Sequence, residues 1–186
     1  MDTKLLVLDL DETLIFGTKE PLDRPADLVV GEYSIYDRPF VRDFLSACGQ
    51  LFKLAVWTSS TEDYASGVVD HLFGSTDCLE FVWARERCTL RFDQSDWVYR
   101  YTKNLKKVNK LGFALDEVIV VDNTREKWTR SFGNLILVSD FEGDLEDAEL
   151  LDLERYLDFL NRFENIRTIE KRGWRSQDYS GQGPVT

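Results

Sequence analysis

Apolar segments of strand length alternate with segments of helical periodicity along most of the chain. Five apolar runs predict the buried strands of a parallel sheet. These runs are residues 4–10, 51–57, 81–83, 118–121 and 135–138. Helices are expected between and after them, following Pro39 and Thr61 and over residues 104–111, 125–132 and 146–163. This alternation indicates an α/β fold with a parallel sheet and helices on both faces.

Three segments depart from this alternation. Residues 16–37 contain prolines and then short apolar runs, which predict a loop followed by a small β ribbon. Residues 87–101 are aromatic without a clear period, and they are expected to be irregular. The glycine-containing end from Lys171 onward predicts a flexible tail. We therefore expect one domain over residues 1–170 and a tail over 171–186.

The composition is that of an ordinary folded domain. The chain has 186 residues, of which 43% are apolar and 31% charged. Its net charge of -11 argues against a broad electrostatic grip on nucleic acid, which relies on clustered Lys and Arg. The same charge still permits one phosphorylated ligand in a small basic pocket.

Cysteine and histidine usage narrows the possible chemistry. Cys48, Cys78 and Cys88 are widely spaced and form no CxxC pair, so neither a disulfide framework nor a zinc site is predicted. The first apolar run is too short for a membrane span and contains Asp9, unlike the core of a signal peptide. We expect a cytoplasmic protein with no membrane partner. His71 is the only histidine, which excludes catalysis by two histidines.

Polar side chains gather where the predicted strands end. Residues 9–13 end the first strand, Thr58 and Ser59 the second, and Asp122 and Asn123 the fourth. Ligands of parallel α/β sheets bind outside the carboxyl ends of the strands. Carboxylates at the ends of buried strands are costly without a partner. A bound divalent cation would offset that cost.

Asp9 and Asp11 lie two residues apart at the end of the first predicted strand. In a regular strand they would face the same side, whereas a turn between them would give them different surroundings. Different surroundings would suit a two-step phosphoryl transfer that uses both residues. In such a reaction one carboxylate attacks phosphorus, and the other protonates the leaving oxygen and later activates water. A free Asp titrates near ~3.9, so an acid at Asp11 would have to be kept protonated by its surroundings. Mg²⁺ prefers carboxylate and carbonyl oxygens together with phosphate and water.

Four motifs in order resemble those of the haloacid-dehalogenase-like (HAD) phosphatases. The matching residues are Asp9-Leu10-Asp11-Glu12-Thr13, Thr58, Lys103 and Asp122-Asn123. Within that superfamily the chain resembles the FCP/SCP type, the small C-terminal-domain phosphatases related to NLI-interacting-factor proteins. Further matching residues are Arg38-Pro39, Trp57-Thr58-Ser59, Arg85-Glu86, 101–105 and 121–124. The resemblance covers about residues 4–163. It implies a HAD-like Rossmannoid three-layer fold with a small β insertion after the first strand and no large cap domain.

The resemblance also implies roles for the residues that act on phosphorus. Asp9 would be the nucleophile and a metal ligand. Asp11 would be the acid and base, and its backbone carbonyl would bind Mg²⁺. Thr58 and Ser59 would contact the phosphate. Lys103 would neutralise the nucleophile and the phosphate.

Two further implied roles concern the metal and the substrate. Asn123 would ligate Mg²⁺, with Asp122 beside it in direct or indirect contact with the metal. Arg85 would contact the phosphorylated substrate. A site without a cap would admit phosphate on a protein, so we expect a monomeric magnesium-dependent phosphatase that acts on phosphoserine or phosphothreonine proteins.

Other interpretations of the same residues stay open at this point. The enzyme could act on a small metabolite or on a polynucleotide end, or the chain could be a non-catalytic phospho-binding module. Asp122 and Asn123 could simply form an Asx turn, Thr58 and Ser59 could cap a helix, and Asp9 and Asp11 could belong to a strand-ending turn.

Two basic positions are also open, and two segments depart from the family. The assignment of Lys103 to the third motif is open, because Arg100, Lys106 and Lys107 lie nearby in the sequence and any lysine there could lie on a solvated helix face. Arg85 could be a surface ion-pair partner instead of a substrate contact. The segment from Arg87 to Lys103 is longer than in small members of the family and is rich in aromatic residues. The segment before Arg38, which helps to form the family's peptide pocket, aligns poorly.

Overall fold

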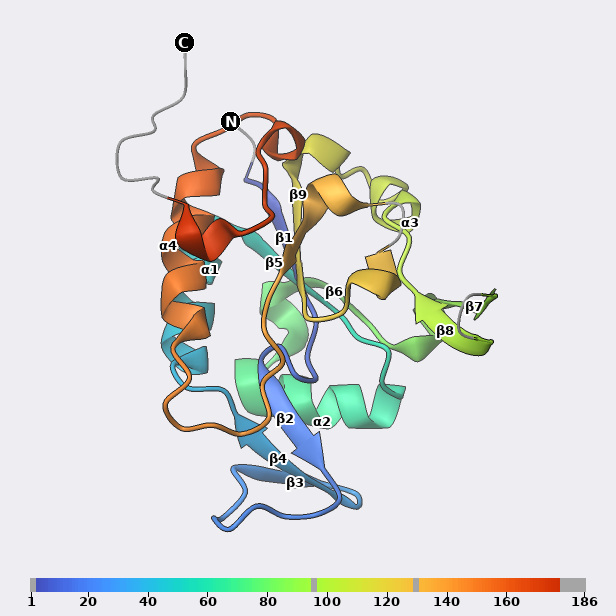
Figure 1. Cartoon of the computed structure of the whole chain (residues 1–186), viewed down its shortest axis with the longest axis vertical. Coiled ribbons are helices and arrows are strands. Elements are labelled where there is room, and N and C mark those ends of the chain that lie inside the picture. Colours follow the sequence, from blue (N-terminus) through green and yellow to red (C-terminus); the bar gives the residue numbers. More distant parts are fainter. Residues whose placement is uncertain (1–2, 95–96, 129–130, 178–186) are drawn as a thin grey trace.

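A computed structural model of the chain describes residues 3–94, 97–128 and 131–177 (Figure 1). Its centre is a five-stranded sheet with the order β10-β9-β1-β5-β6, and all neighbouring strands are parallel. The strands are β1 (Leu5–Leu8), β5 (Lys53–Trp57), β6 (Leu79–Trp83), β9 (Val118–Asp122) and β10 (Leu135–Leu137). The predicted α/β fold with a central parallel sheet is confirmed.

The strand order places a topological switch point next to β1. From β1 the chain builds β5 and β6 on one side, and it then crosses to β9 and β10 on the other side. Leu8 is paired with Val56 of β5 and with Val121 of β9. The carboxyl ends of these three strands therefore lie side by side, which is where an α/β sheet binds its ligand.

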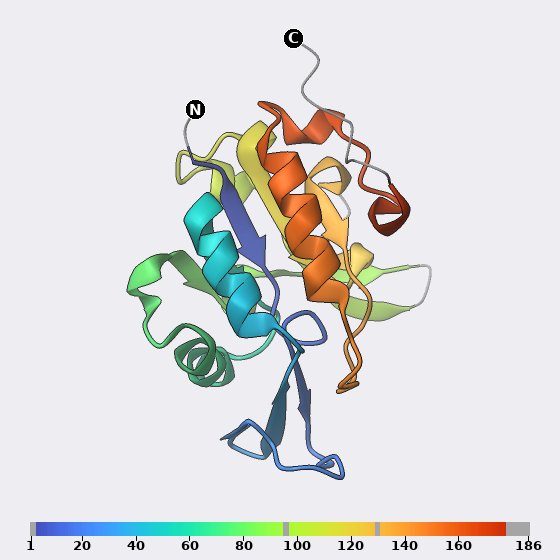
Figure 2. The same cartoon turned by 90° about the vertical axis from the view of Figure 1, so that its left-hand side faces the viewer.

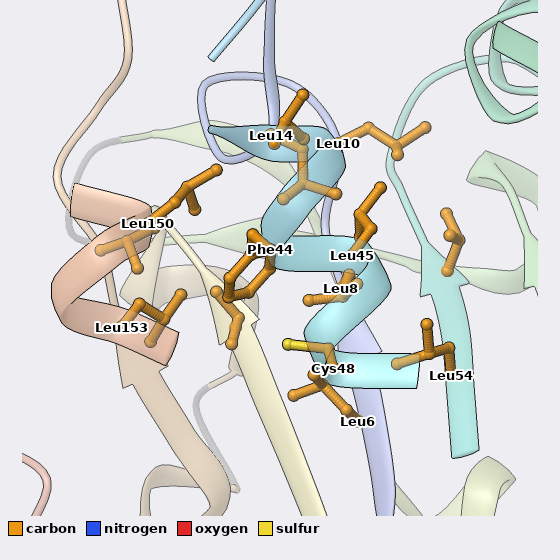
Figure 3. Close-up of a cluster of buried hydrophobic side chains, with 14 of the residues drawn as sticks. Leu6, Leu8, Leu10, Leu14, Phe44, Leu45, Cys48, Leu54, Leu150 and Leu153 are labelled. Carbon is orange, nitrogen blue, oxygen red and sulfur yellow. The ribbon is translucent and has the colours of Figure 1, made fainter. Parts of the chain in front are cut away.

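One face of the sheet carries the larger core and three helices. Leu6 and Leu8 of β1 point to this face, as alternate residues of a strand must. The covering helices are α1 (Val41–Leu51), α2 (Glu62–Phe73) and α4 (Glu149–Asn161). Figure 2 shows α1 and α4 side by side across the sheet. Figure 3 shows how side chains of α1 and α4, such as Phe44 and Leu150, meet the leucines of β1.

The opposite face has a smaller core built around tryptophans. Leu5 and Val7 of β1 lie in this core. The Trp57 ring packs edge-on against Trp83 and Trp128, with centroids 4.8 and 5.6 Å apart. Its cover includes the short helix α3 (Lys106–Asn109) and 3₁₀ turns.

The expected helix over residues 125–132 differs in the structure. Its described part forms the 3₁₀ turns Arg125–Trp128 and Phe132–Asn134, and residues 129–130 lie outside the described ranges. The first turn buries the Trp128 side chain against the tryptophan core. A tight turn thus takes the place of a continuous helix face.

A small antiparallel sheet follows β1, as predicted. It has the order β2-β4-β3, with β2 (Ile15–Thr18), β3 (Leu28–Val30) and β4 (Tyr33–Asp37). Figure 1 shows it extending from the end of the molecule at which the central strands finish. Its last strand leads directly into α1 through Arg38.

The buried Arg38 guanidinium ties this inserted sheet to the loop after β1. It forms a bidentate ion pair with the Asp147 carboxylate, in which Nε donates to Oδ1 at 2.9 Å and Nη2 donates to Oδ2 at 2.7 Å. It also donates to the backbone oxygens of Thr13 and Ser139 at 3.0 and 3.1 Å. Because the guanidinium is buried and every contact is charge-assisted, this arginine fixes the backbone that follows Asp9 and Asp11.

The segment predicted to be irregular contains a regular hairpin. β7 (Thr89–Asp93) and β8 (Val98–Thr102) pair along five residues each. The apolar side chains alternate with arginines and lie largely exposed, so the segment lacks the buried apolar run by which strands are recognised. Cross-strand pairs such as Phe92 with Tyr99 stabilise it instead.

The tail predicted from Lys171 onward is folded over its first seven residues. The Lys171 ammonium donates to the backbone oxygens of Gly133 and Ile169 at 2.9 and 3.0 Å. Trp174 is buried, and its indole nitrogen donates to the Leu137 oxygen at 2.9 Å. Apolar burial of one tryptophan outweighs the local preference of the glycines for a flexible chain. The rest of the predicted tail, residues 178–186, lies outside the described residues.

Candidate active site

A tight turn directly after β1 separates the two motif aspartates. The Asp9 amide still continues the sheet, donating to the Val121 oxygen at 3.0 Å. The chain then reverses, as the amides of Thr13 and Leu14 donate to the Leu10 oxygen at 3.1 and 2.8 Å. Glu12 adopts a positive φ of 59° within this turn. Asp9 and Asp11 consequently have different neighbours.

Asp9 belongs to a buried cluster of two carboxylates and two ammonium groups. Lys103 Nζ lies 3.0 Å from Asp9 Oδ1 and 2.6 Å from Asp122 Oδ2. Lys127 Nζ lies 2.6 Å from Asp9 Oδ2 and 3.4 Å from Asp122 Oδ1. Each lysine therefore bridges both carboxylates, and a backbone bond from the Lys103 amide to the Lys127 oxygen at 2.7 Å holds the two lysines together.

The cluster keeps the Asp9 carboxylate ionised. Burial alone would raise its pKa, but the charges of Lys103 and Lys127 outweigh burial and hold the pKa well below the ordinary value. The pKa of Lys127 is raised, because the attraction of Asp9 and Asp122 exceeds the effect of burial. Asp9 is thus an anion, as a nucleophile must be.

Hydrogen bonds from outside the charged cluster fix the Asp122 carboxylate in place. Its Oδ2 accepts a hydrogen bond from Trp128 Nε1 at 2.8 Å in addition to that from Lys103. Its Oδ1 accepts one from the Thr124 amide at 2.8 Å, which is the Asx turn considered above. Burial, and next the Asp9 charge, raise the pKa of Asp122. Asp122 therefore forms the Asx turn and at the same time belongs to the charged cluster around Asp9.

Asp11 lies in a neutral, hydroxyl-lined environment. Ser60 Oγ donates to its Oδ2 at 2.7 Å, and Tyr64 OH donates to its Oδ1 at 2.6 Å. Burial raises the pKa of Asp11; the two hydroxyl donors oppose this, and the nearby Asp9 charge adds to it. A carboxyl group with a raised pKa beside an ionised carboxylate is the division of labour that acid–base catalysis requires.

The loop after β5 carries Thr58 and Ser59, and Arg85 contacts it. Thr58 is buried, and its hydroxyl oxygen accepts a hydrogen bond from the Ser60 amide at 3.0 Å. Arg85 is exposed, and its Nε donates to the Ser59 oxygen at 2.7 Å. The structure thus brings Thr58 and Ser59 to the strand end beside Asp11, with Arg85 at the outer side of the loop.

Asn123 lies on an acidic rim next to the cluster. Its side-chain nitrogen donates to Glu12 at 2.8 Å and to Asp140 at 2.9 Å, while its oxygen accepts from Thr124 Oγ1 at 3.2 Å. Burial and the Asp140 charge raise the pKa of Glu12. Two lysines balance only Asp9 and Asp122, so this rim keeps an excess of negative charge.

The residues present fit a bound Mg²⁺ ion. Among the residues that the structure describes, no three His, Cys, Asp or Glu side chains are grouped as a cation cage. Mg²⁺ rarely needs one, since it accepts one or two carboxylates and takes its other ligands from water and substrate phosphate. Asp9 Oδ1 is buried, and its contact with Lys103 lacks hydrogen-bond geometry, which leaves an oxygen to which a cation could bind.

Sequence reasoning missed three side chains of this site. Lys127 contacts Asp9 from 118 residues away, and helical periodicity did not distinguish it from its charged neighbours. Tyr64 lies on the buried face of α2, where an aromatic residue gives no signal of a role at the site. Ser60 directly follows the predicted pair Thr58 and Ser59, and its hydroxyl donates to Asp11.

Comparison with known proteins defines the class to which the chain belongs. The sequence model of the NLI interacting factor-like phosphatases matches residues 4–167. A central parallel sheet with the motif residues at its strand ends agrees with that match. The chain therefore belongs to the NLI interacting factor-like phosphatase family.

Individual relatives cover most of the chain. A "Probable C-terminal domain small phosphatase" of Dictyostelium discoideum is 32% identical over 89% of the chain and 53% of its own length. A human "CTD small phosphatase-like protein" is 30% identical over 91% of the chain and 60% of its own length. The chain thus spans little more than half of these relatives.

A solved structure of Fcp1, described as an essential RNA polymerase II CTD phosphatase, shares the fold. The TM-score is 0.56 at 23% identity, over 83% of this chain and 48% of that one.

Across the described residues, none of the helices combines the length and apolar character needed to cross a membrane.

Proposed function

We propose that this chain is a magnesium-dependent phosphomonoester hydrolase that works through a phosphorylated Asp9. The observation that carries the proposal is the contrast within the first motif. Asp9 is an anion between two ammonium groups, while Asp11 is a carboxyl group held by two neutral hydroxyls.

In the first half-reaction an Asp9 oxygen attacks phosphorus. A bond forms between Asp9 Oδ and phosphorus as the bond from phosphorus to the substrate oxygen breaks. Asp11 gives its proton to that departing oxygen, which leaves as an alcohol. The products are a free alcohol and an acyl phosphate on Asp9.

In the second half-reaction Asp11 acts as the base. It takes a proton from water as the water oxygen attacks phosphorus, and the bond to Asp9 breaks. Inorganic phosphate leaves, Asp9 regains its carboxylate, and Asp11 regains its proton. Ser60 and Tyr64 keep the Asp11 carboxyl in one orientation throughout.

Charge on the transferred group is balanced by the cations of the site. Lys127 is the more accessible lysine, with a side chain 19% exposed against 0% for Lys103. We assign Lys127 to the phosphate oxygens and Lys103 to the orientation of Asp9. Thr58 donates its hydroxyl to a phosphate oxygen. Mg²⁺, held by Asp9, Asn123 and the Asp11 carbonyl with Asp122 in support, would supply further charge stabilisation.

The proposed substrate is phosphoserine or phosphothreonine in a protein. Within the described ranges, only the small β2-β4-β3 sheet and the β7–β8 hairpin extend from the central fold on this side, so no large domain covers the strand ends. The names of relatives that describe phosphatases of a C-terminal domain support a protein substrate. A cytoplasmic location and a monomeric state are retained as predictions.

The test is hydrolysis of an aryl phosphate with and without Mg²⁺ by the native chain and by Asp9→Asn. The proposal requires turnover that depends on Mg²⁺ and is lost in the variant. Turnover that persists in Asp9→Asn would contradict it. Rates on a phosphopeptide, a sugar phosphate and a 3′-phosphorylated oligonucleotide would then separate a protein phosphatase from the two alternative enzymes.

A further inference from the structure

The β7–β8 hairpin presents an apolar face that the described chain leaves largely exposed. Pairing places Leu90 opposite Tyr101 and Phe92 opposite Tyr99, so these four side chains share one face. Trp97 extends this face at the far end, with its ring centroid 5.9 Å from that of Phe92. Trp97 is 80% exposed and Tyr99 69% exposed. Aromatic side chains with this exposure are a common feature of docking surfaces.

One end of this apolar face reaches the proposed active site. The Arg85 guanidinium lies 5.4 Å from the centre of the Tyr101 ring. The same side chain donates to the Ser59 oxygen, in the loop that carries Thr58. Figure 1 shows the hairpin extending from the body of the molecule, away from β6. The apolar face therefore begins beside the loop that carries Thr58 and extends away from the proposed active site.

The hairpin region is basic within an acidic protein. Residues 85–107 contain seven Lys and Arg but three Asp and Glu, whereas the whole chain has a net charge of -11. This local excess favours an acidic ligand, and the acidic remainder of the molecule disfavours a long nucleic acid. Repulsion between two chains that each have a net charge of -11 likewise disfavours a second copy as the ligand.

We propose that the apolar face of the β7–β8 hairpin binds the phosphorylated substrate polypeptide beside its phosphoresidue. This proposal rests on the proposed protein phosphatase function. Tyr101 and Trp97 are four residues apart, which corresponds to roughly 13 Å along a strand. An extended substrate would therefore place apolar side chains on this face about three to six residues from the phosphoserine, within an otherwise acidic sequence.

The hairpin also offers its own spectroscopic probe. The other four tryptophans of the chain are at most 7% exposed, so quenching by acrylamide reports mainly on Trp97. With Asp9→Asn as a background that cannot turn over, binding of a phosphopeptide with apolar residues should protect Trp97 from the quencher. The same peptide with serines in place of those residues should protect it far less.

The kinetic test uses the double variant Trp97→Ser with Tyr99→Ser, and Leu145→Ala as a control for loss of an exposed apolar side chain elsewhere. The double variant should raise KM for the apolar phosphopeptide about tenfold and leave aryl phosphate hydrolysis within twofold of the native rate. Equal KM values for the native and double-variant proteins on that peptide, together with normal aryl phosphate turnover, would overturn the docking proposal alone. Absence of turnover on every substrate would instead overturn the proposed function.

Two other occupants can be recognised in the same experiments. A native dimer that the double variant converts to a monomer would overturn the proposal in favour of self-association. Tighter binding of a single-stranded oligonucleotide than of the phosphopeptide, lost in the double variant, would overturn it in favour of nucleic acid.

Discussion

Asp9 and Asp11 are two residues apart, yet their surroundings are opposite in electrostatic character. Asp9 is buried among charges: two ammonium groups contact it, and its pKa is lowered. Asp11 is held by uncharged hydroxyl groups of Ser60 and Tyr64, and its pKa is raised. The comparison teaches that a single reversed turn can give two identical side chains opposite surroundings, as the proposed roles of nucleophile and acid require.

The largest effect within this comparison is expected for Asp11→Asn. The amide keeps the size of the side chain but can neither give nor take the proton, so turnover should fall about 10³-fold. The rate on a nitrophenyl phosphate, whose leaving group needs little protonation, should fall mainly in the second half-reaction. Stopped-flow kinetics should therefore show a burst of nitrophenol equal to the enzyme concentration. A variant with normal steady-state turnover would show that Asp11 has no acid–base role.

A smaller effect is expected for Lys127→Met, which removes one of the two charges from Asp9. We expect kcat to fall about 10²-fold, since one preformed charge facing the phosphate is lost. Mg²⁺ should bind more tightly to this variant in titration calorimetry without substrate, because the neighbouring ammonium no longer neutralises the Asp9 carboxylate. Lys110→Met, which changes an exposed lysine, serves as the control. Unchanged Mg²⁺ affinity and kcat would remove Lys127 from the account.

The smallest effect is expected for Tyr64→Phe, which removes one hydroxyl donor from Asp11. A donor stabilises the ionised carboxylate, so its loss raises the pKa of Asp11 further and moves the pH–rate profile to higher pH. The rate at neutral pH should change about tenfold or less, the value of one hydrogen bond near 1.4 kcal/mol. Tyr33→Phe is the matched control, because the Tyr33 ring packs against Tyr64 at 5.4 Å. An identical profile shift in both variants would argue for a packing effect.

The strands and the position of the site could be predicted from sequence because buried parallel strands leave a strong local signal. Uninterrupted apolar runs identified the five central strands, and polar residues at their ends identified the edge that carries the candidate site. Asp9, Thr58 and Asp122 each follow such a run directly. Their meeting at adjacent strand ends therefore required only the parallel topology.

The side chains that distinguish Asp9 from Asp11 could not be predicted in this way. Tyr64 and Lys127 reach the site from a helix and a 3₁₀ turn, and their contacts depend on tertiary packing over 53 and 118 residues. The hairpin over residues 89–102 was missed because its apolar side chains are exposed. Trp174 was missed because a single buried residue carries no periodicity.

The most direct test of the account is a search for phosphate on Asp9. Asp11→Asn is mixed with an aryl phosphate and Mg²⁺, quenched in acid, and analysed by mass spectrometry of its peptides. The account predicts one phosphoryl group on the peptide that contains Asp9, removed by hydroxylamine as an acyl phosphate and absent from the Asp9→Asn, Asp11→Asn double variant. Turnover with no phosphorylated Asp9 at any time point, or phosphate on another residue, would contradict it.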